Sequence, residues 1–331
     1  MLILSPVDRA SEVAGLRDAG ADEFYAGYVP AFWSDAFGPL VACNRRSFPE
    51  ASVGGIGELD AILHEASFRD AAVHVAANAS PVPDRMLPPM EEMVADFALR
   101  GVRGVIVSDL GLMAALRDRK FRRVEIHAST LFSAFNGAAV AFLRRAGASR
   151  VVVARELSTA EIAAMASAAP GSPLEVLGFR GRCPNIEGFC THLHDDPDRT
   201  WPCELRYEKR PVGASDAATA GAIAAIGRDE GTDRHFSCGL CAVPPLERAG
   251  VHALKIVGRG SETSRKVEAV RAVAAMREWG RGADPDHAAC ARRGKALYLE
   301  TFGRACRPEN CYFPEFRPGD DGGGPLPGRR E

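Results

Sequence analysis

The sequence lacks a long apolar run and a large excess of charge of either sign. None of its uninterrupted apolar stretches reaches the roughly 18 residues that a membrane-spanning helix needs. The apolar start of MLILSPVDRASE has no basic region before it and no cleavage signature after it, so no secretory signal peptide is expected. The net charge of −2 gives no whole-chain case for binding nucleic acid, although a local basic patch would still permit RNA. We therefore expect a cytoplasmic protein with no membrane span and with a small-molecule substrate.

The signatures of several enzyme classes are also missing. HExxH, GxSxG and a catalytic Cys–His pattern do not stand out in the sequence, which disfavours the peptidases and hydrolases that depend on them. No GxGxxG follows the first predicted strand. An open, doubly wound dinucleotide-binding sheet is therefore the weaker of two fold hypotheses.

Cysteine, in contrast, is plentiful. The chain has nine, an odd number, and stable disulfides are rare in a reducing cytoplasm. Metal binding or redox chemistry is therefore the better expectation. Three of these cysteines lie in GFRGRCPNIEGFCTHLHDDPDRTWPC, as Cys183, Cys190 and Cys203, and two more form CGLC, as Cys238 and Cys241.

Short β-branched runs alternate with amphipathic helical stretches along most of the chain. The runs are mostly apolar on both faces, as expected for parallel strands covered by helices. Eight such alternations predict an α/β fold of the (β/α)8 TIM-like barrel type, complete or slightly irregular. The predicted strands are 2–5, 23–27, 72–78, 104–109, 124–129, 150–156, 174–179 and 253–259.

The predicted barrel takes up residues 1–282, including a cysteine-rich insertion over 180–252 between the seventh and eighth strands. Residues 283–316 then form a carboxy-terminal extension that contains Cys290, Cys306 and Cys311. The glycine- and proline-rich stretch 317–331 has the composition of a disordered tail.

Active sites of such barrels lie at the carboxyl ends of the strands, which selects a short list of residues. His127, Ser129 and Glu156 are the candidates for catalysis or proton handling. The arginines suggest an anionic small molecule, because guanidinium groups pair with carboxylates in a bidentate manner. Arg155 and Glu156 are neighbours on one strand, so only one of them should face the barrel lumen. Candidates for substrate binding are Asn78, Asp109, Arg155, Arg180 and Arg259.

The thiols around the insertion predict a metal centre. Cys183, Cys190 and Cys203 with either Cys238 or Cys241 would supply the four thiolates of a [4Fe–4S] cluster. The same set could hold tetrahedral zinc, although CGLC is the one pair among them with the close spacing of a zinc knuckle. The third hypothesis is that these cysteines are thiols that bind no metal.

Whole phrases of the sequence resemble the collagenase-like peptidase family U32. EIHASTLFSAFNGAAVAFLRRAGASRVVVARELSTAEI, residues 125–162, is similar to a family segment with His-x-Ser-Thr, Asn, a helix and Arg-Glu-Leu-Ser. AGVHALKIVGR, residues 249–259, is similar to the family's Ala-Gly-Val-x-x-Leu-Lys-Ile-x-Gly-Arg. The cysteine-rich stretch lies between the two phrases, as in that family, and the resemblance covers roughly residues 1–265.

The resemblance implies iron–sulfur chemistry on a barrel scaffold. The better understood branches are O2-independent hydroxylases, namely ubiquinone-biosynthesis hydroxylase subunits and tRNA- and ribosomal-RNA-hydroxylation proteins, with prephenate as the implied oxygen donor. It would make Cys183, Cys190 and Cys203 three ligands of the cluster. Ungapped counting back from Lys255 selects Cys238 as the fourth, whereas the phrase GLCAV selects Cys241.

The chain departs from that family at several places. Cys43 precedes paired arginines in ACNRRS, Cys306 and Cys311 lie outside the signature, and the separate carboxy-terminal domain of longer members is missing. Because the longer members include RNA-directed proteins, this favours a small-molecule or protein-partner substrate over RNA, and the family resemblance makes an aromatic small molecule the expected one. Three functions follow: an iron–sulfur-dependent, O2-independent hydroxylase, a non-catalytic iron–sulfur subunit that works only beside a homologous partner, or a peptidase. The expected protein partner is a homologous subunit or a second copy of the chain in a homodimer.

Overall fold

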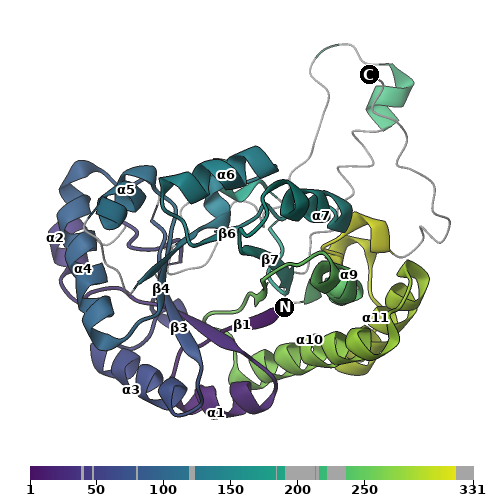
Figure 1. The fold of residues 1–331 in the computed structure, drawn as a ribbon, viewed down its shortest axis with the longest axis horizontal. Helices are drawn as coiled ribbons and strands as arrows, with labels where there is room; N and C mark the ends of the chain where they lie inside the picture. Colours follow the sequence, from purple (N-terminus) through teal and green to yellow (C-terminus); the bar gives the residue numbers. More distant parts are fainter. Residues whose placement is uncertain are drawn as a thin grey trace.

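Eight parallel strands close into a barrel in the order β1 to β8, which confirms the predicted fold (Figure 1). The computed structural model describes residues 1–38, 41–46, 48–79, 81–118, 124–183, 185–190, 213, 216–221 and 236–317. The strands are β1 Leu2–Pro6, β2 Glu23–Gly27, β3 Ala72–Ala77, β4 Gly104–Val107, β5 Glu125–Ala128, β6 Arg150–Val152, β7 Leu174–Phe179 and β8 Ala253–Ile256. All eight predicted strands are present, and several end two to four residues earlier than predicted, because the chain leaves the sheet to build the mouth of the barrel.

Helices surround the barrel on the outside (Figure 1). They are α1 Ala10–Asp18, α2 Trp33–Phe37, α3 Ile56–Ser67, α4 Leu87–Arg100, α5 Leu110–Asp118, α6 Gly137–Ala146, α7 Thr159–Ala168, α9 Val243–Arg248, α10 Thr263–Ala283 and α11 His287–Phe302. In the part of the chain that the structure describes, no helix is both long and apolar enough to cross a membrane.

Local sequence signals explain where several helices begin and end. α7 begins with a complete capping box, in which Ser158 accepts from the Glu161 N–H and Glu161 accepts from the Ser158 N–H. Gly101 ends α4 in the left-handed conformation, with φ of 95°, where a side chain would be strained.

Alternate residues of each strand face the lumen or the helices. Ile3, Phe24 and Val105 point outward and join the main apolar core between sheet and helices. Their neighbours Leu4 and Tyr25, with Ile106, form a small separate apolar cluster. We place this cluster inside the barrel, because successive residues of a strand point to opposite faces.

A layer of charged side chains lies beneath that cluster, near the amino ends of the strands. Arg150 Nη1 contacts Glu23 at 2.7 Å and Glu175 at 3.2 Å, and Lys255 Nζ donates to Glu175 at 3.1 Å. His74 Nε2 lies 3.5 Å from Glu23. Because these charges are buried, each depends on its partners, and removal of one partner would leave an uncompensated charge.

The carboxy-terminal extension packs beside β7. The 3-10 turns η8 Pro308–Asn310 and η9 Pro314–Phe316 follow α11. α11 packs against the turn η7 Leu240–Ala242 and against α10. Cys311 forms an isolated parallel bridge with Cys238. The described part of the extension is therefore joined to the barrel through the segment that carries CGLC.

Candidate functional site

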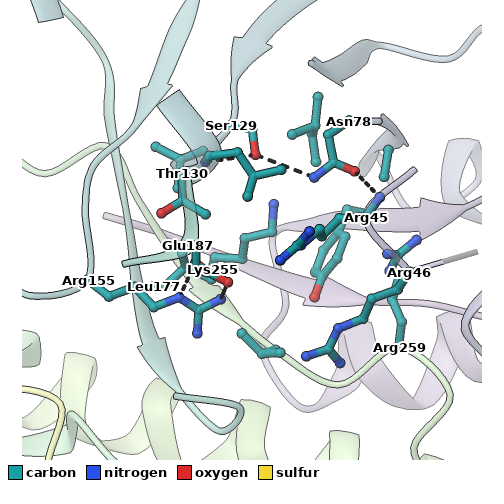
Figure 2. Close-up of a pocket in the computed structure, with 16 residues that line it drawn as sticks. Arg45, Arg46, Asn78, Ser129, Thr130, Arg155, Leu177, Glu187, Lys255 and Arg259 are labelled. Atoms are coloured by element: carbon teal, nitrogen blue, oxygen red, sulfur yellow. Dashed lines mark hydrogen bonds and ion pairs between the residues drawn. The ribbon is translucent and has the colours of Figure 1, made fainter. Parts of the chain in front are cut away.

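A polar pocket opens at the carboxyl ends of the strands, where the fold predicts an active site (Figure 2). Its empty volume is about 680 Å³, including the open solvent at its entrance. Five of the lining side chains are cationic, and one is a carboxylate. The lining residues are Tyr25, Arg45, Arg46, Ala76, Asn78, Ile106, Ser129, Thr130, Leu131, Val152, Arg155, Leu177, Glu187, Lys255, Val257 and Arg259.

Arg155 and Glu187 form one wall of the pocket (Figure 2). The guanidinium of Arg155 binds both carboxylate oxygens of Glu187, with Nε to Oε2 at 2.6 Å and Nη2 to Oε1 at 2.9 Å. Its Nη1 also donates to Gly181 O at 2.6 Å and to the Tyr312 hydroxyl at 3.0 Å. Burial disfavours the charged guanidinium, but the Glu187 carboxylate outweighs it and raises the pKa of Arg155. This cation is therefore already paired.

Arg45, Arg46 and Arg259 lie across the pocket from that pair (Figure 2). Both Nη atoms of Arg259 donate to Asn44 Oδ1 at 3.1 Å, so its partner is a neutral amide. Burial, together with the nearby charge of Arg46, lowers the pKa of Arg259 to about 10. A bound anion would be stabilised here, because it would offset the repulsion between these cations.

Tyr25 and Lys255 form the floor. Lys255 Nζ lies 4.3 Å from the centroid of the Tyr25 ring and is paired with Glu175 below. Burial lowers the pKa of Lys255, and the charge of Glu175 partly offsets this. The Tyr25 hydroxyl donates to Ile256 O at 3.0 Å, which fixes the ring. Lys255 is therefore the ionisable cation at the base of the pocket.

Asn78 and Ser129 connect the ends of β3 and β5. Asn78 Nδ2 donates to Ser129 Oγ at 3.4 Å, and Asn78 Oδ1 accepts from the Arg45 N–H at 3.1 Å. Ser129 Oγ also accepts from the Leu131 N–H at 3.3 Å. The Asn78 amide and the Leu131 N–H both donate hydrogen bonds to Ser129 Oγ, whereas a nucleophilic serine needs a base that takes its proton. The geometry suits orientation of a ligand better than attack by Ser129.

The structure brings four of the predicted residues into the pocket and places four elsewhere. Asn78, Ser129, Arg155 and Arg259 line it. Glu156 is exposed, as expected if Arg155 faces the mouth. Asp109 accepts from the Leu112 N–H at 2.8 Å near the start of α5. Arg180 lies over the Phe302 ring, with Cζ 5.4 Å from the centroid, and its Nη2 is 3.8 Å from Glu268.

His127 is fully buried and does not line the pocket. Its Nε2 lies 3.1 Å from Glu125, and its ring is 4.5 Å from the His74 ring, centroid to centroid. Burial, together with the charge of His74, lowers the pKa of His127 to about 4. It is therefore a neutral imidazole near pH 7, in the layer below the site.

Sequence reasoning missed several lining residues. Tyr25 and Lys255 lie within strands, where alternation gives their face only after the barrel register is known. Glu187 belongs to the cysteine-rich stretch, where the cysteines were considered as site residues and this carboxylate was not. Arg45 and Arg46 lie in ACNRRS and were noted only as the neighbours of Cys43. Paired arginines in a loop after the second strand are the signal that could have found them.

The predicted metal ligands are divided between two places. Cys183 lies two residues after Gly181, whose carbonyl oxygen accepts from Arg155 at the barrel mouth, and Cys190 ends the turn that carries Glu187. Cys238 and Cys241 are buried in a second pocket with Cys306 and Cys311. Cys203 lies outside the described residues, and Cys43 is buried with its thiol 3.8 Å from Met93 Sδ.

Two known proteins are similar to this chain in sequence. The sequence is 27% identical over 194 residues to tRNA hydroxylation protein P of Haemophilus influenzae (57% of this chain, 37% of that protein). It is 26% identical over 309 residues to tRNA hydroxylation protein P of Escherichia coli K12 (78% of this chain, 63% of that protein). The chain thus spans less than two thirds of the length of either relative.

Among solved structures, the U32 peptidase Mk0906 matches with a TM-score of 0.43 and 15% identity, over 56% of this chain and 73% of that one. The sequence model of peptidase family U32 matches residues 9–307, which include nearly the whole barrel and part of the carboxy-terminal extension. The chain belongs to peptidase family U32.

Proposed function

We propose that this chain is an iron–sulfur-dependent, O2-independent hydroxylase that binds a carboxylate-bearing oxygen donor of the prephenate type at the barrel mouth. The observation that carries the proposal is the cationic pocket. Arg155 and Lys255 already have carboxylate partners, whereas Arg259 is held by the neutral Asn44 amide. The names of the two relatives support a hydroxylation role.

A donor with two carboxylates matches the distribution of charge. One carboxylate would pair with Arg259 beside Arg46, where it offsets the repulsion between the cations. The other end of the donor would lie toward Lys255, whose ammonium donates hydrogen bonds at the floor. Asn78 and Ser129 would orient the ring of the donor from the β3 and β5 side. Each of these residues binds or orients, and Lys255 can also hold a proton for the reaction.

The thiols near the mouth fit an iron–sulfur group in part. Cys183 and Cys190 lie on the segment after β7, half-buried and close to Arg155 and Glu187. Cys203 would be the third ligand implied by the family resemblance. A bound cluster would supply one-electron chemistry, and its potential would depend on nearby charge and solvent exposure.

The hydroxylated acceptor can be an aromatic small molecule or a tRNA base. The net charge of −2 disfavours RNA, whereas both relatives are named for tRNA hydroxylation. The aromatic small molecule is therefore our first choice, and tRNA is the second.

The test begins with donor binding by the anaerobically purified chain, measured by isothermal calorimetry with prephenate. We expect saturable binding that Arg259→Ala weakens about tenfold or more, because a charge-assisted hydrogen bond is lost. Arg265→Ala is the matched control, since Arg265 is half-exposed on α10 and pairs with Glu262 at 3.4 Å. Equal binding by the two variants would contradict the assigned pocket.

Catalysis is then followed by mass spectrometry with O2 excluded. Aromatic acceptors and unmodified tRNA are offered in separate reactions, and the hydroxylated product identifies the class. Product that appears only after a homologous partner chain is added would make this chain a cluster-carrying subunit. Peptide hydrolysis by cluster-free protein would support the peptidase instead.

A further inference from the structure

A second, apolar pocket lies between η7 and the carboxy-terminal extension, and four cysteines line it. These are Cys238 and Cys241 from CGLC and Cys306 and Cys311 from CRPENC, called here the thiol quartet. The two pairs are far apart in the sequence and come together only because the extension folds back onto the barrel. The proposed hydroxylase does not use this pocket.

The backbone holds two members of the quartet in register. Cys238 N–H donates to Asn310 O at 2.8 Å, and Tyr312 N–H donates to Cys238 O at 2.9 Å, which closes the bridge between Cys238 and Cys311. Leu240 N–H donates to Cys238 Sγ at 3.4 Å, the kind of N–H to sulfur bond that supports a thiolate ligand.

α11 is shaped to accept Cys241. A Cβ added at Gly294 would lie 2.5 Å from Cys241 Sγ and 2.8 Å from its backbone nitrogen, so a glycine is required where the helix crosses this thiol. Lys295, the next residue, lines the same pocket and places a cation beside these thiols. A cation beside four thiols is favourable when those thiols are deprotonated by a metal.

We propose that Cys238, Cys241, Cys306 and Cys311 together bind one iron–sulfur cluster, separate from the barrel mouth. Four cysteine thiolates are the usual ligand set for such a cluster. A single zinc ion needs sulfur atoms about 3.8 Å apart, given its tetrahedral Zn–S bonds of about 2.3 Å. Among the described residues, the group with ligand atoms all within 4.8 Å of one another is His74, Glu125 and His127, and no three quartet sulfurs meet that limit. The wider spacing favours the larger group.

The assignment has a consequence for the mouth. Cys238 and Cys241 then belong to the quartet, and Cys183, Cys190 and Cys203 are the thiols available to a cluster there. Tyr312 lies between the two places, since its hydroxyl contacts both Arg155 Nη1 and Arg180 O. Tyr312, which follows Cys311 of the quartet in the chain, therefore connects the quartet to the wall of the barrel mouth.

The first experiment measures iron, sulfide and zinc in full-length protein purified without O2. We expect Cys306→Ser and Cys311→Ser each to lose about four irons per chain, the content of one [4Fe–4S] cluster. Cys290→Ser is the matched control, because Cys290 is a buried thiol of α11 outside the pocket, 3.8 Å from Pro285 O. Unchanged iron in both variants would overturn the proposal, and loss of one zinc in place of iron would overturn the cluster.

A second measurement on the wild-type protein does not depend on the folding of a variant. Alkylation with iodoacetamide, followed by peptide mass spectrometry, should label the whole quartet only after chelation and oxidation remove the iron. Equal labelling of Cys306 and Cys311 before and after that treatment would contradict the site. Prephenate binding by Cys311→Ser distinguishes the quartet from the proposed function at the barrel mouth. If this variant loses iron but still binds prephenate, the quartet holds a cluster and the mouth pocket is unaffected.

Discussion

At the residue scale, Gly27 determines whether Arg259 can reach the mouth of the barrel. Gly27 ends β2, and a Cβ there would lie 2.0 Å from Arg259 Nη1 and 2.4 Å from Ala51 O. The first atom belongs to a flexible side chain and could move, but the second is backbone. A side chain at this position therefore displaces both the cation and the turn that supports it.

Gly27→Ala should weaken donor binding and lower the free energy of unfolding by about 1–3 kcal/mol, the usual result of overpacking. Urea unfolding and calorimetric binding measure the two effects. Gly57→Ala is the control, because its Cβ meets no atom within 4 Å in α3 and alanine is the better helix former. Normal binding by Gly27→Ala would show that Arg259 does not need this space.

His127 makes stability depend on pH. Burial lowers its pKa from 6.5 to about 4, so the unfolded chain takes up a proton at this site before the folded chain does. The contribution to stability is complete above pH 6.5 and is lost as the pH falls toward 4. It amounts to roughly 3 kcal/mol, an order of magnitude set by the size of the shift.

Thermal unfolding between pH 4 and 7.5 tests this. His127→Gln, which cannot titrate, should flatten the decline in melting temperature below pH 6.5. The same change at exposed His64 on α3 should leave the decline as in the wild type. A parallel decline in both variants would mean that other groups cause the acid sensitivity.

At the scale of elements, the amino end of α7 is held from two sides. Ser158 and Glu161 form the capping box, while Glu315 of the extension accepts from the Thr159 N–H at 2.7 Å and from its hydroxyl at 2.6 Å. A carboxylate is favourable here because it lies at the positive end of the helix dipole. The cap and the extension therefore stabilise the same helix end.

Ser158→Ala should lower the free energy of unfolding by about 1 kcal/mol, the usual cost of a lost cap. Glu315→Gln keeps the hydrogen-bonding oxygen and removes the charge, so it should have a smaller effect. Chemical denaturation of both variants measures the difference. No change in Ser158→Ala would show that Glu315 alone is sufficient at this helix end.

At the scale of the whole molecule, the carboxy-terminal extension packs against the closed barrel. Tyr312, Phe313 and Phe316 are buried, and the Tyr312 hydroxyl contacts the wall of the mouth through Arg155. Each buried aromatic side chain is worth about 1.5–3 kcal/mol. The extension thus contributes to the free energy of unfolding through its buried aromatic side chains, although it follows the last helix of the barrel.

Truncation after Phe302 should therefore lower the melting temperature markedly and expose Cys238 and Cys241, which line the pocket of the thiol quartet. Truncation after Arg317 retains every contact described for residues 236–317 and should have a much smaller effect. Differential scanning calorimetry of the two chains measures this. Equal melting temperatures would mean that residues 303–317 add no stability.

The sequence determined the class of fold with little ambiguity. Eight apolar runs at the spacing of β/α units can bury both faces only as parallel strands covered by helices. The capping box at Ser158 and the glycine after α4 are equally local, since each depends on residues within one turn. The phrases around His127 and Lys255 indicated the family without any structural information.

Tertiary structure decided which residues share a site. The prediction grouped Arg180 with Arg155 because both lie at the carboxyl ends of predicted strands, yet Arg180 has φ of 58° and its side chain lies against α11 instead of the mouth. Barrel closure brought Lys255 and Tyr25 into the pocket, because lumen-facing positions are fixed by register. Folding of the extension brought Cys306 and Cys311 to CGLC. Such contacts join segments far apart in the chain, and spacing along a sequence carries no information about them.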